Sequence, residues 1–193
     1  MSCIAATLDS LETGAGLYGR LMAHAAGLAN DELFAKMLVS QATGVGALPP
    51  GLGLDPAEFA ELLGRHFPDS GPLGLTAADG LDALRQPERD DLVGLMLEGR
   101  ADADISEAWM ARIVAAACMA GDHLWQDLGL WSRQDLSRLM TDNFPRLAAK
   151  NDRDMKWKKF LYRQICDREG IPVCPAPSCQ ACVDYAKCFN TES

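Results

Sequence analysis

The sequence predicts an all-α fold: a single helical bundle-like domain of about six to eight helices, followed by a C-terminal cysteine-rich metal-binding loop. Leu and Ala dominate the apolar positions, aromatic residues make up only 7% of the chain, and β-branched residues are sparse. Leu and Ala favour helices, whereas strands are enriched in β-branched and aromatic residues. The 193 residues are enough for one domain with its own core. We expect residues 1–170 to form the helical domain and residues 171–193 to form a loop packed on it.

Two helices are predicted near the start of the chain. Residues 7–28 carry leucines at helical spacing, although several glycines weaken the pattern. Asn30 and Asp31 can cap a second helix, because their side chains accept hydrogen bonds from first-turn amides. This second helix should stop near Gly44.

The next two helices have clear starting signals. In Asp55-Pro56-Ala57-Glu58, the Asp carboxylate can accept from first-turn amides and Pro suits the first helical position. This helix should end before Pro68, and we expect His66 to be an inward-facing residue at its end rather than a metal ligand. After an irregular stretch, residues 87–97 should form the following helix, opened by a proline and a run of acidic residues.

Three further helices are expected in the second half. Residues 106–121 are rich in alanine, which lets another helix approach closely, and Cys118 there is expected to be a small buried hydrophobe. Ser132 with Asp135 can start another helix. The last long helix should cover residues 152–168, with a buried stripe formed by Trp157, Phe160, Leu161 and Ile165.

Charge and targeting signals narrow the class of protein. The N-terminal residues lack a basic export signal and no window is apolar enough to span a membrane, so we expect a soluble, cytoplasmic protein. The net charge is −9, and residues 1–149 carry 21 acidic against 10 Lys and Arg residues. This acidic body argues against non-specific nucleic-acid binding. Residues 150–170 reverse the balance, with seven basic against four acidic residues.

Four of the seven cysteines lie in what we call the cysteine segment, residues 174–188. Cys174, Cys179, Cys182 and Cys188 follow the spacing C-x4-C-x2-C-x5-C. Converging thiolates are soft ligands, which select zinc, cuprous copper or iron–sulfur clusters over hard cations. Prolines in the first gap disfavour a helix, so the segment is predicted to be a loop wrapped around a metal centre.

The spacing favours an iron–sulfur cluster but leaves other sites open. Four-cysteine zinc sites usually combine two close pairs from a longer loop, whereas only one C-x2-C pair is present here. A single short loop fits a larger cluster better than one ion, although ferredoxin spacing is different. Disulfides suit short secreted scaffolds and are less consistent with this chain.

Other residues can assist the thiolates. The basic side chains of the last helix can offset the negative charge of a thiolate-bound cluster, or attract an oxyanion such as molybdate. The alternative is a merely solvated helix face. His123 and Cys166 are possible auxiliary ligands, although a helix-end histidine and a packed thiol are the simpler interpretations. The basic residues in question are Lys156, Lys158, Lys159 and Arg163.

Three stretches resemble the NifQ nitrogen-fixation proteins. The C-terminal stretch Met155-Lys-Trp-Lys-Lys-Phe-Leu-Tyr-Arg-Gln-Ile-Cys-Asp-Arg-Glu-Gly170, followed by the cysteine spacing and Phe189, is similar to that family's signature. His123-Leu-Trp-Gln-Asp-Leu-Gly-Leu and Phe144-Pro-Arg-Leu-Ala resemble its central region. The likeness runs from about Ala108 to Phe189, and residues 1–105 match only in general helical character.

The resemblance implies a molybdenum donor for nitrogenase iron–molybdenum cofactor synthesis. It implies a mixed molybdenum–iron–sulfur cluster held by Cys174, Cys179, Cys182 and Cys188, with molybdate as the metal source. The partners it implies are the dinitrogenase reductase and the scaffold complex for cofactor assembly. The expected protein is a metal carrier rather than an enzyme, in keeping with the lack of a convincing catalytic triad, dinucleotide-binding motif or Walker loop.

Two other functions stay open from the residues. The cluster could contain only iron and sulfide and serve electron transfer or regulation. Alternatively, the four cysteines could bind zinc and stabilise a helical interaction module.

Overall fold

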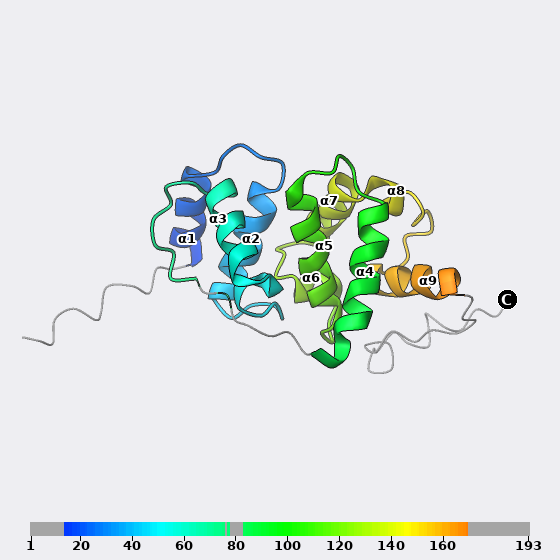
Figure 1. The fold of residues 1–193 in the computed structure, drawn as a ribbon. Helices are drawn as coiled ribbons and strands as arrows, with labels where there is room; N and C mark the ends of the chain where they lie inside the picture. The colour runs from blue at the N-terminus through cyan, green and yellow to red at the C-terminus, as the bar shows by residue number, and fades with distance from the viewer. Residues whose placement is uncertain (1–13, 76, 78–82, 170–193) are drawn as a thin grey trace, which may run out of the picture.

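A computed structural model describes residues 14–75, 77 and 83–169 of the chain (Figure 1). This part contains nine α-helices, two short 3₁₀ helices and no strand, which confirms the all-α prediction. The helix count exceeds the expected six to eight because α6 and α8 are only four residues long. The cysteine segment and the expected boundary at residue 170 lie outside the described residues. The elements are α1 (Gly14–Ala23), α2 (Asp31–Ala42), η1 (Pro50–Gly53), α3 (Pro56–His66), η2 (Ala83–Arg85), α4 (Gln86–Glu98), α5 (Ile105–Cys118), α6 (Leu124–Asp127), α7 (Arg133–Asn143), α8 (Pro145–Ala148) and α9 (Trp157–Glu169).

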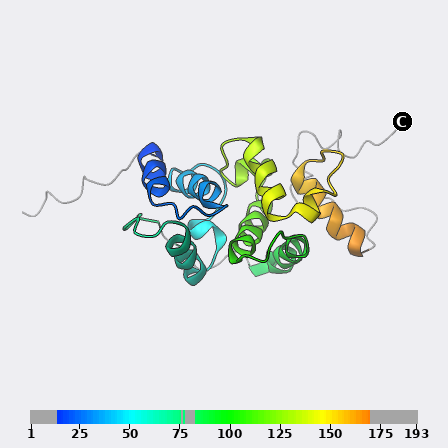
Figure 2. The same cartoon turned by 90° about the horizontal axis from the view of Figure 1, so that it is seen from above.

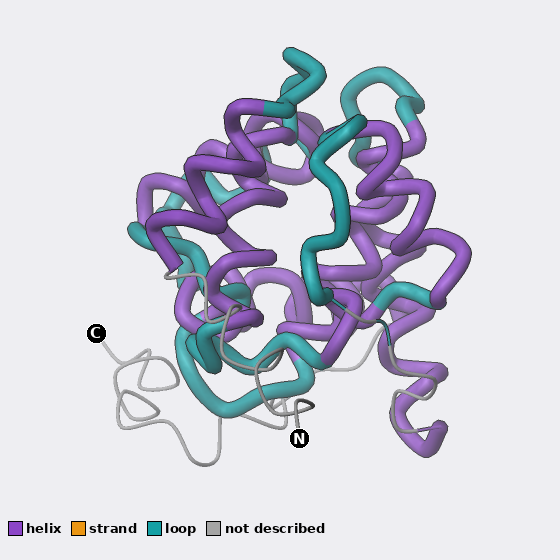
Figure 3. Tube along the Cα trace, turned by 90° about the vertical axis from the view of Figure 1, so that its left-hand side faces the viewer, coloured by secondary structure: helices purple, strands orange, loops and turns teal. Residues whose placement is uncertain are grey.

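The helices follow the chain from one end of the molecule to the other. Figures 1 and 2 show α1, α2 and α3 grouped at one end, α4 and α5 in the middle, and α9 at the opposite end. Helix α1 packs on α2, and α4 packs on both α5 and α9. Figure 3 shows the described chain as helices joined by loops. None of these helices is both long and apolar enough to cross a membrane.

Helix α5 is the centre of the hydrophobic core. Apart from Ile105, Ala108 and Arg112, all its residues are buried, and Trp109 is only 1% exposed. Its alanines leave room for α4 to pack closely against it, as the composition predicted. Cys118, the last residue of α5, is buried as expected.

The predicted helix starts are formed by side-chain caps at two places. Asp55 Oδ1 accepts from the backbone N–H of Glu58 at 2.8 Å, which caps α3. Ser132 Oγ accepts from the N–H of Asp135 at 3.1 Å, which caps α7. Because a cap satisfies an amide that the helix leaves unpaired, these signals can be recognised locally.

The Asn30 side chain does not form the expected cap of α2, because it makes long-range hydrogen bonds instead. Asn30 makes no side-chain cap bond. Its Nδ2 donates to Asn143 Oδ1 at 2.7 Å and to Ser106 Oγ at 3.1 Å, and Asn143 Nδ2 donates back to Asn30 Oδ1 at 3.0 Å. All three residues are buried, so the starts of α2 and α5 and the end of α7 share one satisfied polar cluster.

His66 faces inward at the end of α3, as predicted, and is 1% exposed. Its Nδ1 lies 2.6 Å from Asp31 Oδ1, and its ring packs edge-on against Phe34 at 4.7 Å. Burial lowers the pKa of His66, while the Asp31 carboxylate works against this shift. The pair joins α3 to the start of α2.

The free energy of unfolding should fall as the pH is lowered from 7 to 5, with His66 contributing part of the loss. Because its pKa is lowered in the folded protein, the unfolded chain binds the proton first, below about pH 6.5. One such group changes stability by at most about 1.4 kcal/mol per pH unit. Urea unfolding at several pH values should show a flatter dependence for His66→Gln than for the wild type, and equal slopes would contradict this assignment.

Two predicted helices are shorter than the sequence pattern suggested. Helix α1 ends at Ala23, and the chain then turns through Gly27 at φ +80°. Helix α9 begins at Trp157 rather than near residue 152. There, the Asn151 side chain accepts from the N–H of Met155 and donates to its carbonyl, both at 2.9 Å, and so closes a turn.

Candidate metal centre and the helix that precedes it

Helix α9 is the last described element before the cysteine segment. Glu169 ends the helix, and Cys174 follows five residues later in the sequence. The predicted ligands Cys174, Cys179, Cys182 and Cys188 lie outside the described residues, so their assignment stays a prediction. The described part of the chain closest in sequence to the predicted metal centre is α9, together with the residues that contact it.

The buried face of α9 matches the predicted stripe. Phe160, Leu161 and Ile165 are each at most 8% exposed, and Trp157 packs partly buried against Phe160 with ring centroids 5.7 Å apart. Cys166, a possible auxiliary ligand, is on the same buried face at 4% exposure. This face packs on α4.

Lys158 belongs to the buried side of α9 as well. It is 8% exposed, and its Nζ forms an ion pair with the Asp127 carboxylate and donates to the Ala120 carbonyl at 2.9 Å. Burial raises the pKa of Asp127, and the Lys158 ammonium opposes that rise. The positive charge of Lys158 is therefore balanced by the Asp127 carboxylate inside the protein.

A second polar contact attaches α9 to α4. The Tyr162 hydroxyl donates to Glu88 Oε1. Arg85 also donates to the Glu88 carboxylate, from Nε to Oε2 at 2.9 Å and from Nη2 to Oε1 at 3.0 Å, and to the Met119 carbonyl at 2.7 Å. Burial and the hydrogen bond to Glu88 raise the pKa of Tyr162. The hydroxyl is therefore protonated at neutral pH and donates to the carboxylate.

The remaining predicted basic residues lie toward solvent. Lys156 and Arg163 are exposed, and Lys159 is half-buried. Arg163 Nε lies 3.7 Å from Asp167 Oδ2, a distance typical of a weak surface pair. The electrostatic role of these residues stays a prediction.

His123 is the N-cap residue of α6, but it makes no side-chain cap bond. Its carbonyl accepts from the N–H groups of Gln126 and Asp127 at 2.8 and 3.0 Å, and the residue is half-buried. Among the described residues, no group of three or more His, Cys, Asp or Glu side chains could hold a metal ion. If His123 or Cys166 binds the metal centre, the other ligands must therefore come from outside the described residues, as predicted for the cysteine segment.

Cys118 does not provide a thiolate at neutral pH. It is fully buried at the end of α5, and burial raises its pKa to about 12. Since metals bind the thiolate, this cysteine is better explained by packing.

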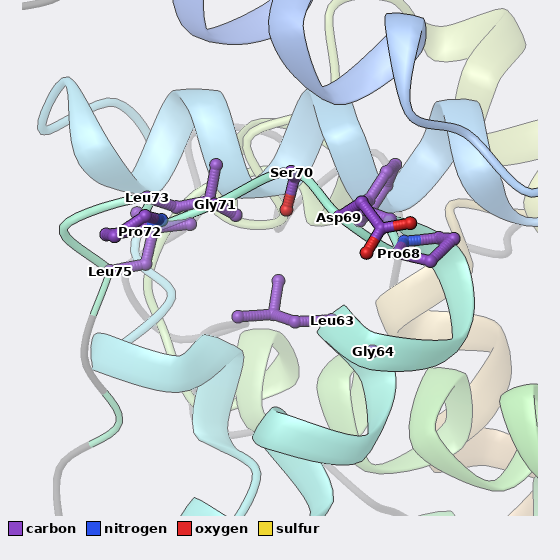
Figure 4. Close-up of a pocket in the computed structure, with 10 residues that line it drawn as sticks. Leu63, Gly64, Pro68, Asp69, Ser70, Gly71, Pro72, Leu73 and Leu75 are labelled. Atoms are coloured by element: carbon purple, nitrogen blue, oxygen red, sulfur yellow. The ribbon is translucent and has the colours of Figure 1, made fainter.

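An open cavity of about 360 Å³ lies between the end of α3 and the chain that follows it (Figure 4). Helix α3 is at the opposite end of the molecule from α9 (Figure 1). The described residues that line the cavity include one carboxylate, that of Asp69, and no His or Cys. This cavity offers little to a metal. Its lining consists of Leu63, Gly64, Phe67, Pro68, Asp69, Ser70, Gly71, Pro72, Leu73 and Leu75.

Sequence reasoning did not identify the residues that anchor α9. Asp127 and Glu88 were not singled out, although Asp127 lies within the stretch 123–130 that carried part of the family resemblance. Their partners are 31 and 74 residues away. A single sequence gives no local signal for such pairs.

Comparison with known proteins gives a consistent family assignment. The sequence profile of the NifQ family matches residues 33–190, which include the cysteine segment and begin well before Ala108. The likeness thus extends into residues 33–105, where only a general helical character was expected to match. No solved structure matches the chain.

Three NifQ proteins illustrate the similarity. Protein NifQ of Azotobacter vinelandii is 44% identical over 175 residues, covering 85% of this chain and 90% of that protein. Those of Klebsiella pneumoniae and Rhodobacter capsulatus are each 40% identical, covering 76% and 81% of this chain and 90% and 86% of the respective proteins. The family profile and these relatives agree over most of the chain, and this protein therefore belongs to the NifQ family.

Proposed function

We propose that this protein carries molybdenum on a thiolate-bound iron–sulfur core and donates it for synthesis of the nitrogenase iron–molybdenum cofactor. The observation that carries the proposal is the C-x4-C-x2-C-x5-C spacing inside the span that matches the NifQ family. Family membership is consistent with a role in molybdenum supply for this cofactor. The protein is a carrier in this proposal, and no catalytic step is assigned to it.

The donor set fits such a core. Four cysteines within fifteen residues offer soft thiolates, and these suit iron–sulfur clusters. The described residues add no competing cluster of metal ligands, and the buried Cys118 thiol is not ionised at neutral pH. Cys174, Cys179, Cys182 and Cys188 are therefore the residues that would hold the core.

The charge distribution supports uptake of an anionic metal source. Molybdate is an oxyanion and is attracted by positive charge. Residues 150–170, directly before the cysteine segment, carry a net positive charge, whereas residues 1–149 carry a net negative charge. Lys156 directly precedes α9, and Lys159 and Arg163 lie on its more accessible side, where these side chains can attract an anion or offset the charge of a thiolate-bound cluster. Lys158 has a different role, because Asp127 balances its charge.

A carrier must also release its cargo. In a structural zinc site the protein ligands fill every coordination position of the metal. A metal donor instead needs a metal centre that a partner protein can reach and a moderate affinity for the metal. We propose that docking on the dinitrogenase reductase or on the scaffold complex for cofactor assembly leads to transfer of molybdenum. The cysteine segment provides the ligands that give up the metal.

Transfer of labelled molybdenum tests the function directly. Protein purified without oxygen should be brown and contain both iron and molybdenum. When it is loaded with labelled molybdenum and mixed with the assembly proteins, the label should reach the cofactor. Label that stays on the protein, with iron and sulfide present, would favour an electron-transfer protein. Colourless protein containing zinc would favour the structural zinc module.

A further inference from the structure

The two stretches that carried much of the resemblance in the sequence meet at one buried ion pair. Asp127 lies within residues 123–130 and Lys158 within residues 155–170, and they are 2% and 8% exposed. Both side chains have further partners: Asp127 Oδ2 accepts from the N–H of Asp122 at 3.1 Å, and Lys158 donates to the Ala120 carbonyl. The ion pair thus connects α9 to α6, and the hydrogen bond to Ala120 connects α9 to the chain that directly follows α5.

Tyr162 adds a second buried polar contact one helical turn further along. It lies four residues after Lys158, so both side chains are on the same face of α9. Tyr162 contacts Glu88 of α4, and Arg85 holds the Glu88 carboxylate in place. These two directional contacts attach the inner face of α9 to α6 and α4, in addition to the exposed ion pair between Arg168 and Glu98 of α4 at 3.0 Å.

Directional contacts fix a helix more closely than apolar packing does. Hydrophobic contacts depend on area and tolerate small rotations or shifts, whereas hydrogen bonds weaken steeply when their geometry changes. A shift of α9 would also take the Lys158 ammonium away from the Asp127 carboxylate, which is 2% exposed, and loss of the counter-charge of a buried carboxylate is costly. The two contacts consequently set both the rotation and the axial position of α9.

The position of α9 limits where the first predicted ligand can lie. Cys174 is five residues after the end of the helix, and five residues of chain span at most about 18 Å. Groups that hold metal ligands in place commonly affect metal affinity by 10–100-fold when they are removed.

We infer that Lys158 and Tyr162 are positioning residues for the metal centre, which act by fixing α9 on Asp127 and Glu88. This inference rests on the proposed function, because it concerns how firmly the cysteine segment retains molybdenum. It assigns Lys158 a role distinct from that of the exposed basic residues, since it acts through placement of the helix rather than through its charge.

The test compares two buried ion pairs in the full-length protein. Lys158→Met and Asp127→Asn break the proposed positioning pair from opposite sides. Lys36→Met and Asp135→Asn break the matched pair between α2 and α7, where Lys36 Nζ lies 2.7 Å from Asp135 Oδ1 and Lys36 is also 8% exposed. Tyr162→Phe removes only the second contact. All variants are loaded without oxygen with iron, sulfide and molybdate.

Three measurements separate positioning from a general loss of stability. Thermal unfolding of the metal-free proteins measures the cost to the fold. Hydrogen exchange measures protection of the α9 amides. Release of molybdenum to a chelator, well below all unfolding temperatures, and the electron paramagnetic resonance spectrum of the iron report on the metal centre.

Lys158→Met and Asp127→Asn should both release molybdenum about tenfold faster than the wild type, with faster exchange in α9 and an altered spectrum. Tyr162→Phe should show a smaller increase, about threefold. Lys36→Met and Asp135→Asn should lower the unfolding temperature while leaving release and spectrum unchanged.

Equal release rates for the two pairs would overturn the inference and leave the proposed function intact. Faster release without any change in α9 exchange would also overturn it, because Lys158 would then act by its charge. A wild-type protein that binds neither iron nor molybdenum would overturn the proposed function and the inference together.

Discussion

Cys179→Ala and Cys182→Ala should each abolish retention of iron and molybdenum in protein purified without oxygen. These residues form the single C-x2-C pair of the cysteine segment, and a cluster that loses one of four thiolates loses a covalent anchor. The helices should persist, because the described residues form their own hydrophobic core around α5. Metal analysis and far-ultraviolet circular dichroism measure the two effects.

Cys118→Ala provides the control for this experiment. Its thiol is buried and protonated at neutral pH, so the variant should keep its metal and lose only a little stability. Full metal content in both Cys179→Ala and Cys182→Ala would show that the ligands have been assigned wrongly. Loss of metal from Cys118→Ala alone would have the same meaning.

Gly129→Ala should destabilise the folded protein by about 3 kcal/mol. Gly129 has φ +66°, and a Cβ atom added there would lie 2.6 Å from Ser40 Cβ. Ser40 cannot simply move away, since its Oγ donates to the Gly129 carbonyl at 2.6 Å. The substitution therefore combines backbone strain with a clash between the chain after α6 and helix α2.

Gly121→Ala is the matched control, because no heavy atom lies within 4 Å of an added Cβ and its φ is outside the left-handed region. Urea unfolding of the metal-free proteins should give a much lower midpoint for Gly129→Ala than for Gly121→Ala. Similar midpoints for the two variants would mean that the contact between Gly129 and Ser40 relaxes without cost.

Local signals predicted the helices well, and contacts between distant residues explain most of the differences. The Asp55 cap of α3 and the buried stripe of α9 depend on neighbours within a turn or two, and both were found from the sequence. Asn30 was expected to cap α2 but pairs instead with Asn143, far along the chain. No local pattern distinguishes these two uses of an asparagine.

At the candidate site, too, local patterns in the sequence were informative and contacts between distant residues were not predicted. The four cysteines are predicted to be metal ligands from their spacing, because soft ligands gathered in a short segment are unusual without a metal, and this assignment stays a prediction. The basic residues of α9 were grouped by charge alone, yet Lys158 lies on the buried side and contacts Asp127. Its different role follows from its position relative to α6, which a helical pattern does not specify.

The buried amide pair between Asn30 and Asn143 has a consequence for protein synthesis. The two residues are 113 positions apart, so at typical rates a ribosome needs roughly 6 to 23 s to reach the second after making the first. During that interval the Asn30 side chain lacks its Asn143 partner. The hydrogen bonds that join the start of α2 to the end of α7 can therefore form only after Asn143 has emerged from the exit tunnel, whereas α1 and α2 can pack on each other earlier.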